Sequence, residues 1–262
     1  MSEQLPGWSE GRFAHDGVEH VVFRRGSGPP VIVIHEIPGV TPTVVRFAER
    51  VVDAGYTVAL PWLFGEVARP KTTGYALAQI ARACVSREFH VLASSGSSPV
   101  VDWLRALARS LHAELGGRGV GALGMCLTGN FALAMAVDDA LMAPVLSQPS
   151  LPFPISASHR RGLHLRDEDL AIVRGRCARD GLRVLGLRFT HDPTVPVERF
   201  DALQAALGEG FERVDIDSGP GNPHGLPANA HSVLTEHLVD EAGHPTRAAL
   251  DRVLALFATR LR

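Results

Sequence analysis

The sequence predicts an α/β fold in which helices cover both faces of a mostly parallel central sheet. Three observations support this prediction: short runs of apolar, β-branched residues, segments whose apolar residues recur at helical spacing, and a regular alternation of the two. With 262 residues the chain is long enough for one large domain. We therefore expect residues 1–262 to form a single unit, with residues 1–18 as an N-terminal extension.

The first strand–helix unit has the clearest signals. Residues 31–34 are a continuous apolar run, which is typical of a strand buried on both faces. Thr41 is a suitable helix cap, Pro42 suits the first helical position, and apolar residues repeat at helical spacing until Gly55. Residues 56–60 then return as a second strand.

The same alternation continues towards the C-terminus. Further elements are expected from the same patterns: strands at 120–125, 182–189 and 211–216, and helices at 104–115, from Pro196 and at 250–261. Two stretches do not fit the alternation, 64–98 and the Gly/Pro/Asn-rich 218–230. Because long loops at the carboxyl ends of parallel strands shape ligand sites, both are expected near the active site.

Composition excludes several classes of protein. A net charge of −2 gives no reason to expect nucleic acid or an anionic membrane as a partner. The most apolar stretch, residues 120–146, contains glycines, an asparagine and two aspartates, which makes it a poor membrane span. Three widely spaced cysteines argue against a disulfide framework, and the N-terminus carries no signal-peptide pattern, so we expect a cytoplasmic protein.

The segment Gly124-Met-Cys-Leu-Thr-Gly129 carries the strongest chemical signal. It follows an expected strand and precedes a helix-forming stretch, which is the context of a nucleophile elbow. The following helix would direct its N-terminal N–H groups at the sulfur of Cys126 and favour the thiolate. Two other interpretations remain: Cys126 as a small buried hydrophobe, or as the thiol of a redox sensor.

A glycine match overlaps this segment. Gly119-Val-Gly-Ala-Leu-Gly124 fits the dinucleotide-binding pattern G-x-G-x-x-G, which would suggest a nucleotide-binding oxidoreductase. That pattern requires its glycines at the turn after a strand, whereas here they lie within the expected strand itself. We therefore interpret the match as accidental and expect no nucleotide cofactor.

Four segments together resemble the dienelactone hydrolase family of α/β-hydrolases, from about Val31 onwards. They are the elbow with Cys126, the strand end with Glu36 in Val31-Ile-Val-Ile-His-Glu-Ile-Pro-Gly39, Asp192 in His191-Asp-Pro-Thr-Val-Pro196, and His231 in His231-Ser-Val-Leu234. Pro61-Trp-Leu-Phe-Gly65 resembles a further family segment. The order nucleophile, acid, histidine is that of α/β-hydrolases generally.

The resemblance implies hydrolysis of a small-molecule ester or lactone through an acyl-cysteine, without a cofactor. It makes Cys126 the nucleophile, His231 its base and Asp192 the residue that orients the histidine. From the sequence alone, Asp192 could also be a turn residue before Pro193.

The resemblance also implies supporting residues. The backbone N–H groups of Ile37 and Leu127 would form the oxyanion hole. Glu36 would contact the resting thiol, although a strand-end carboxylate merely solvated in the cleft is the alternative. Two positions depart from the family: Thr128 stands where glycine is usual, and Thr235 where dienelactone-cleaving members carry an arginine that holds a substrate carboxylate.

Other charged residues compete for a role. Arg82 or Arg87 could supply a substrate-binding cation, although neither lies in a matching motif. His224, His237 and His244 lie near His231, but their spacing does not place two ligands one helical turn apart, so no metal site is expected. Only His231 is followed by Ser-Val-Leu, which identifies it as the expected base.

Overall fold

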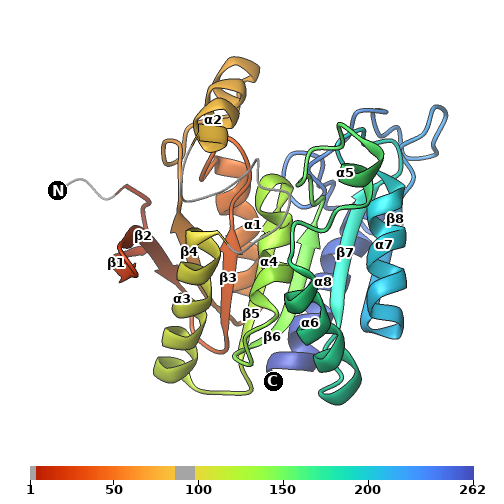
Figure 1. Ribbon diagram of the computed structural model, residues 1–262. Coiled ribbons are helices and arrows are strands. Elements are labelled where there is room, and N and C mark those ends of the chain that lie inside the picture. The colour runs from red at the N-terminus through yellow and green to blue at the C-terminus, as the bar shows by residue number, and fades with distance from the viewer. Residues whose placement is uncertain (1–3, 86–97) are drawn as a thin grey trace.

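An eight-stranded sheet organises the chain, with helices on both of its faces (Figure 1). The computed structural model describes residues 4–85 and 98–262. The strands are β1 Ser9–His15, β2 Val18–Arg25, β3 Pro30–Ile34, β4 Thr57–Trp62, β5 Val120–Met125, β6 Leu141–Ser147, β7 Val184–Phe189 and β8 Phe211–Ile216. The helices are α1 Pro42–Asp53, α2 Thr73–Val85, α3 Pro99–Leu115, α4 Gly129–Met135, α5 Ala157–Arg161, α6 Asp167–Arg179, α7 Val197–Leu207 and α8 Pro245–Leu261. Single 3₁₀ turns lie at 126–128 and 208–210.

The spatial order of the strands is β1-β2-β4-β3-β5-β6-β7-β8. All neighbours from β4 to β8 run parallel, and only β1–β2 and β2–β4 are antiparallel. The predicted α/β fold with a mostly parallel sheet is therefore confirmed. Because the carboxyl ends of parallel strands share one edge, the segments after β3, β5 and β7 meet there.

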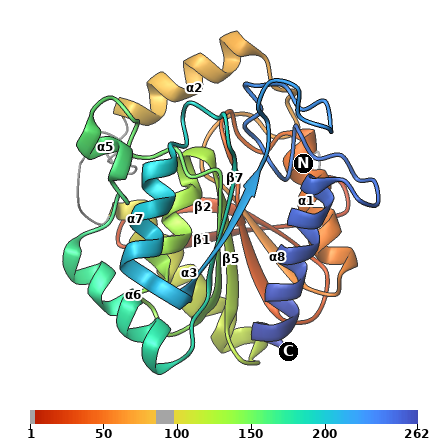
Figure 2. The same ribbon diagram turned by 90° about the vertical axis from the view of Figure 1, so that its right-hand side faces the viewer.

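Two layers of helices bury the two faces of the sheet. Helices α1 and α8 pack on one face, and α3, α4, α6 and α7 pack on the other (Figure 2). Strand β3 is fully buried, and its side chains alternate between the layers: Val31 and Val33 join one core cluster, Ile32 and Ile34 the other. This alternation is the period-two pattern of a strand covered on both sides.

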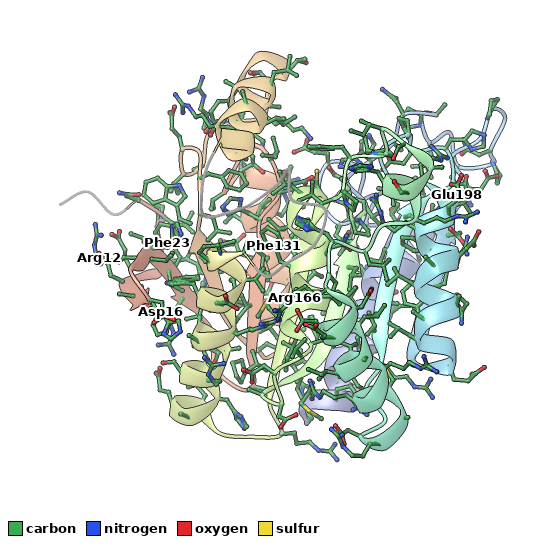
Figure 3. All side chains as sticks on the ribbon, viewed as in Figure 1. Arg12, Asp16, Phe23, Phe131, Arg166 and Glu198 are labelled. Carbon is green, nitrogen blue, oxygen red and sulfur yellow. The ribbon has the colours of Figure 1, made fainter. Side chains whose placement is uncertain are left out.

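Side chains follow the same division between inside and outside (Figure 3). Phe131 of α4 and Phe23 of β2 lie in the core, whereas Arg12 and Asp16 of the N-terminal hairpin point outwards. Glu198 lies at the outer surface of α7, where it pairs with Arg160.

Helix α1 begins and ends at the predicted signals. The Thr41 side chain accepts a hydrogen bond from the N–H of Val44, and Pro42 occupies the first turn. Gly55 follows the helix with a φ of +87°, a conformation that glycine adopts without strain.

Six elements escaped the sequence patterns: β1, β2, β6, α2, α5 and α6. Residues 9–25 form a hairpin at the sheet edge, within and beyond the N-terminal extension, and β6 lies inside the long apolar stretch 120–146. Part of the expected loop 64–98 is the helix α2, while residues 86–97 lie outside the described part. No helix in the described ranges is long and apolar enough to cross a membrane.

Candidate active site

The turn after β5 holds Cys126 in a strained conformation. Its φ is +55°, which non-glycine residues seldom adopt and which marks sites where strain is retained. A Cβ on Gly124 would lie 2.1 Å from the carbonyl oxygen of Thr128, and one on Gly129 would lie 2.6 Å from Cα of Pro149. Both flanking positions must therefore be glycine for strand, turn and α4 to approach this closely.

Thr128, a departure from the family pattern, reinforces this turn. Its hydroxyl oxygen accepts the N–H of Met125 at 3.0 Å and lies 3.1 and 3.2 Å from the carbonyl oxygens of Ile34 and His35. The side chain is fully buried. The hydroxyl therefore links the elbow to the end of β3.

Asp192 and His231 meet at the same sheet edge. Asp192 lies just beyond β7, His231 lies in the long connection between β8 and α8, and His231 Nδ1 is 2.6 Å from Asp192 Oδ2. The N–H and hydroxyl of Thr194 donate to Asp192 Oδ1 at 2.9 and 2.8 Å. Burial would raise the pKa of Asp192, but the hydrogen bonds from His231 and Thr194 hold that pKa below its usual value.

The contact with Asp192 fixes the tautomer of His231. Because Nδ1–H is donated to the carboxylate, Nε2 is the nitrogen available to the sulfur of Cys126. Burial alone would lower the pKa of His231, but the negative charges of Cys126 and Asp192 and its hydrogen bonds to both outweigh burial. The pKa of His231 therefore lies well above its usual value.

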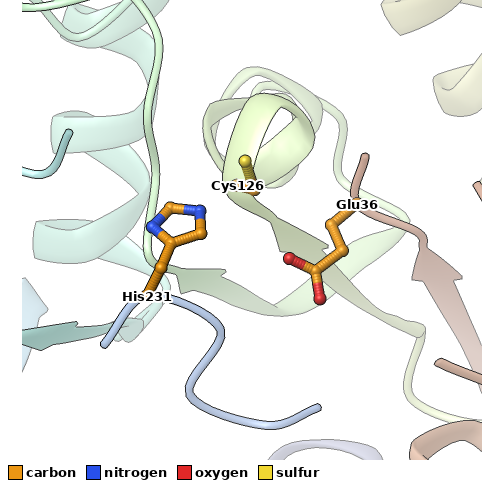
Figure 4. Close-up of side chains that lie close together, drawn as sticks. All are labelled: Glu36, Cys126 and His231. Atoms are coloured by element: carbon orange, nitrogen blue, oxygen red, sulfur yellow. The ribbon is translucent and has the colours of Figure 1, made fainter. Parts of the chain in front are cut away.

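Glu36 completes a cluster with Cys126 and His231. One ligand-type atom of each lies within 4.8 Å of the others, and the three side chains lie close together (Figure 4). The Glu36 carboxylate is almost fully buried and accepts the hydroxyl of Ser232 at 2.6 Å and that of Thr235. Thr235, which replaces the family arginine, thus holds a protein carboxylate.

His35 braces the segment that presents Glu36 and Ile37. Its Nε2 accepts the N–H of Leu63 at 3.1 Å, so Nδ1 carries the proton and donates to the carbonyl of Glu36 at 3.0 Å. Complete burial lowers the pKa of His35 to about 4. A neutral histidine therefore ties the end of β3 to the end of β4.

A second chain of hydroxyl groups connects the nucleophile with the acid. Ser150 Oγ lies 3.7 Å from Cys126 Sγ and 3.4 Å from Thr194 Oγ1, which in turn donates to Asp192. Thr194 Oγ1 also lies 3.2 Å from His231 Nδ1. The sequence reasoning missed Ser150 and Thr194. Thr194 could have been noticed, because an Asp two residues before a Thr favours a local side-chain-to-backbone turn.

Arg199 anchors the loop that carries Ser150. This fully buried guanidinium donates to the backbone carbonyls of Pro149 at 2.7 Å, Gly162 and His159 at 3.0 Å, and Pro152. Burial lowers the pKa of Arg199 to about 10. The same loop carries Phe153 into the wall of the site.

A cavity of about 220 Å³ opens over the sulfur. Its walls are mostly apolar, and Cys126, Ser150, Thr194 and His231 form the polar floor. The apolar lining residues are Ile37, Ala76, Ile80, Leu127 and Phe153. Both residues expected to supply oxyanion-hole N–H groups therefore border the cavity.

The cation beside this cavity is not the one expected. Lys71 lines it and also lines a neighbouring hollow with Glu236 and His237. Arg82 is exposed in the last turn of α2 and does not line the cavity, and Arg87 lies outside the described residues. Lys71 lies within the stretch 64–98, but no sequence motif distinguishes it.

The competing histidines lie elsewhere. The ring of His224 packs edge-on against that of His244, with centroids 5.1 Å apart, whereas Asp192 pairs with His231. His237 Nδ1 accepts the backbone N–H of His231 at 3.4 Å. Residues 218–230 contribute nothing to the lining of the cavity, although they lead directly into His231.

Comparisons with known proteins agree with this architecture. The profile of the dienelactone hydrolase family matches residues 20–161. A search of curated proteins gives no match. A dienelactone hydrolase from Anabaena variabilis ATCC 29413 superposes with a TM-score of 0.59 at 16% identity, covering 98% of this chain and 100% of that one.

Two proteins from metagenomic libraries give similar superpositions. A cold-adapted esterase from an Arctic intertidal library has a TM-score of 0.60 at 16% identity, covering 99% of this chain and 97% of that one. A promiscuous phosphotriesterase described as dienelactone hydrolase-like has a TM-score of 0.59 at 16% identity, covering 97% and 98%. At these identities the structural matches establish the α/β-hydrolase fold.

Proposed function

Because this chain belongs to the dienelactone hydrolase family, we propose that it cleaves a carboxylic ester or lactone through an acyl-cysteine at Cys126. Family and fold together identify a hydrolase of the ester or lactone type. The finer proposal assigns the chemistry to Cys126, His231 and Asp192. It rests on the hydrogen bond of 2.6 Å that turns Nε2 of His231 towards a cysteine held in a strained turn beside a cavity.

In the first half-reaction, Nε2 of His231 takes the thiol proton and Sγ of Cys126 attacks the carbonyl carbon. The carbonyl π electrons move to oxygen, where the N–H groups of Ile37 and Leu127 stabilise the oxyanion. When the tetrahedral intermediate collapses, the C–O bond breaks and the alkoxide leaves with the proton from His231. Asp192 stabilises the transient imidazolium.

In the second half-reaction, His231 removes a proton from water, and the hydroxide attacks the thioester carbonyl. The C–S bond then breaks, the carboxylic acid leaves, and the proton returns to the sulfur. The two half-reactions together consume one ester and one water. They yield one acid and one alcohol, and they require no cofactor.

Glu36 is the proposed control on the nucleophile. Its carboxylate lies within 4.8 Å of the sulfur and is fixed by the hydroxyls of Ser232 and Thr235. Since like charges at this separation repel, the carboxylate opposes the thiolate that His231 favours. A substrate bound in the cavity would change how strongly the Glu36 carboxylate opposes ionisation of the thiol.

The acyl group that fits the site is small and apolar. Ile80, Leu127 and Phe153 line the walls of the cavity. Its volume of about 220 Å³ limits the acyl group to a few carbons or a single ring. We accordingly propose short-chain or aryl carboxylic esters, and lactones of similar size, as substrates.

The proposal is tested with the 4-nitrophenyl esters of acetate, butyrate and benzoate. Cys126→Ala should remain folded and lose turnover, whereas Cys177→Ala, which changes a cysteine at the other end of the molecule, should retain it. Mass spectrometry of quenched wild-type protein should find one acyl group on Cys126. Full turnover in folded Cys126→Ala would disprove the proposal.

A further inference from the structure

We propose that Glu36, Cys126 and His231 bind one Zn²⁺ ion, and that this ion blocks the nucleophile. Among the described residues, these three form the one group of potential ligands close enough to share an ion. Binding of the metal depends only on their geometry. Inhibition of hydrolysis also rests on the proposed function of Cys126.

The donor set suits zinc. A thiolate, an imidazole nitrogen and a carboxylate oxygen are the ligand types that Zn²⁺ takes, at about 2.0–2.3 Å from the metal. Tetrahedral ligands at those lengths lie roughly 3.3–3.7 Å from one another. The three atoms already lie within 4.8 Å of one another, so side-chain movements of about an ångström close the site (Figure 4).

The proposed ligands His231 and Glu36 are themselves hydrogen-bonded to other side chains, as zinc ligands in proteins usually are. Histidine ligands in proteins donate their other ring N–H to a carboxylate, and His231 Nδ1 is 2.6 Å from Asp192 Oδ2. The carboxylate ligand is itself hydrogen-bonded, by Ser232 and Thr235. Both ligands are therefore oriented before a metal arrives, which reduces the cost of binding.

Charge also favours a dication at this point. Without a metal, the Glu36 carboxylate and a Cys126 thiolate repel each other across at most 4.8 Å. A Zn²⁺ ion between them neutralises both charges and stabilises the thiolate.

The cavity leaves room for a fourth ligand. It opens over Cys126 and His231, so a water molecule can complete the tetrahedron. Coordination to zinc withdraws electron density from Sγ and makes it a weaker nucleophile, and Nε2 of His231 can neither accept nor return a proton while it binds the metal. Occupancy by zinc and hydrolysis through Cys126 therefore exclude each other.

Cobalt(II) provides a spectroscopic test independent of activity, because thiolate coordination to Co²⁺ produces an intense near-ultraviolet charge-transfer band. The protein used is Cys84→Ala/Cys177→Ala, in which Cys126 is the remaining thiol. Adding Co²⁺ should produce the band at a stoichiometry of one, and Zn²⁺ should abolish it. Cys126→Ala in this background should show no band.

A further variant tests the support of the Glu36 carboxylate, and a second variant is its control. Thr235→Val keeps the side-chain shape but removes a hydrogen bond to Glu36, and it should weaken Zn²⁺ binding about 10- to 100-fold. His224→Ala changes an exposed histidine whose ring packs against that of His244, and it should leave the affinity unchanged. Unchanged affinity in Thr235→Val, or loss of binding in His224→Ala, would overturn the proposed ligand set.

Hydrolysis is then measured against free Zn²⁺. Turnover of 4-nitrophenyl acetate should fall to half at a free Zn²⁺ concentration equal to the zinc Kd that the competition with Co²⁺ gives, and EDTA should restore it. A cobalt band without any esterase activity would refute the proposed function and leave the metal site standing. Activity unaffected at saturating Zn²⁺, or a missing cobalt band, would refute the metal proposal and leave the hydrolase standing.

Discussion

Replacing Glu36 by glutamine removes a negative charge beside the nucleophile with little change in shape. Two unit charges 4.8 Å apart, the upper limit of the separation here, repel by about 3.5 kcal/mol at an effective dielectric constant of 20 and about 0.9 kcal/mol at 80. Each 1.36 kcal/mol changes the thiolate population tenfold. Glu36→Gln should therefore alkylate between about 4-fold and 300-fold faster at neutral pH. The near-complete burial of the carboxylate favours the upper part of this range.

The assay follows the loss of Cys126 to iodoacetamide by mass spectrometry of the peptide, between pH 5 and 9. Metal is removed with EDTA beforehand, so that zinc cannot protect the sulfur. Glu198→Gln is the matched control, because it removes a carboxylate from the outer surface, where Glu198 pairs with Arg160. Its alkylation rate should equal that of the wild type.

An unchanged or slower alkylation rate in Glu36→Gln would refute this reasoning. Glu36→Asp tests the charge separately from the position of the carboxylate, because it keeps the negative charge but shortens the side chain. It should alkylate more slowly than Glu36→Gln. If both variants react equally fast, then the hydrogen bonds from Ser232 and Thr235 matter and the charge does not.

Further predictions follow from the other contacts. His231→Ala should lower kcat/KM for 4-nitrophenyl acetate at least ~100-fold, and adding Asp192→Asn should cost little more, because the pair acts as one unit. Because the pKa of Asp192 is lowered in the folded protein, its carboxylate contributes stability above about pH 4, and this contribution is lost as the pH falls through the pKa of the folded state. In urea titrations, Asp192→Asn should therefore be less stable than the wild type at pH 7 and should lose less further stability in acid. Thr128→Val should cost roughly 1–3 kcal/mol of unfolding free energy by leaving the buried N–H of Met125 without an acceptor. Arg199→Met should cost about 3 kcal/mol or more by the same measurement, because four carbonyls lose a charged donor; stability equal to the wild type in either variant would contradict these assignments.

Local patterns were sufficient for the central part of the fold. The strand at 31–34 and the helix from Pro42 follow from continuous burial, a cap and helical spacing, which are properties of adjacent residues. The same patterns failed for β1 and β2, because these strands are defined by antiparallel pairing across the sheet edge. They also failed for α2, which lies in the stretch 64–98 that the alternation of strands and helices did not include.

The sequence by itself determined which residues we propose as the carriers of the chemistry, because short motifs mark them. Cys126 between two glycines, Asp192 after a strand and His231 before Ser-Val-Leu are each recognisable within a few residues. Only the tertiary structure decided which residues support them. Ser150 reaches the sulfur through a loop held by Arg199, and Thr235 reaches Glu36 across almost 200 positions of the chain. The physical reason is that parallel strands bring their carboxyl ends to one edge, so contacts there depend on the order of strands in space and not on distance along the sequence.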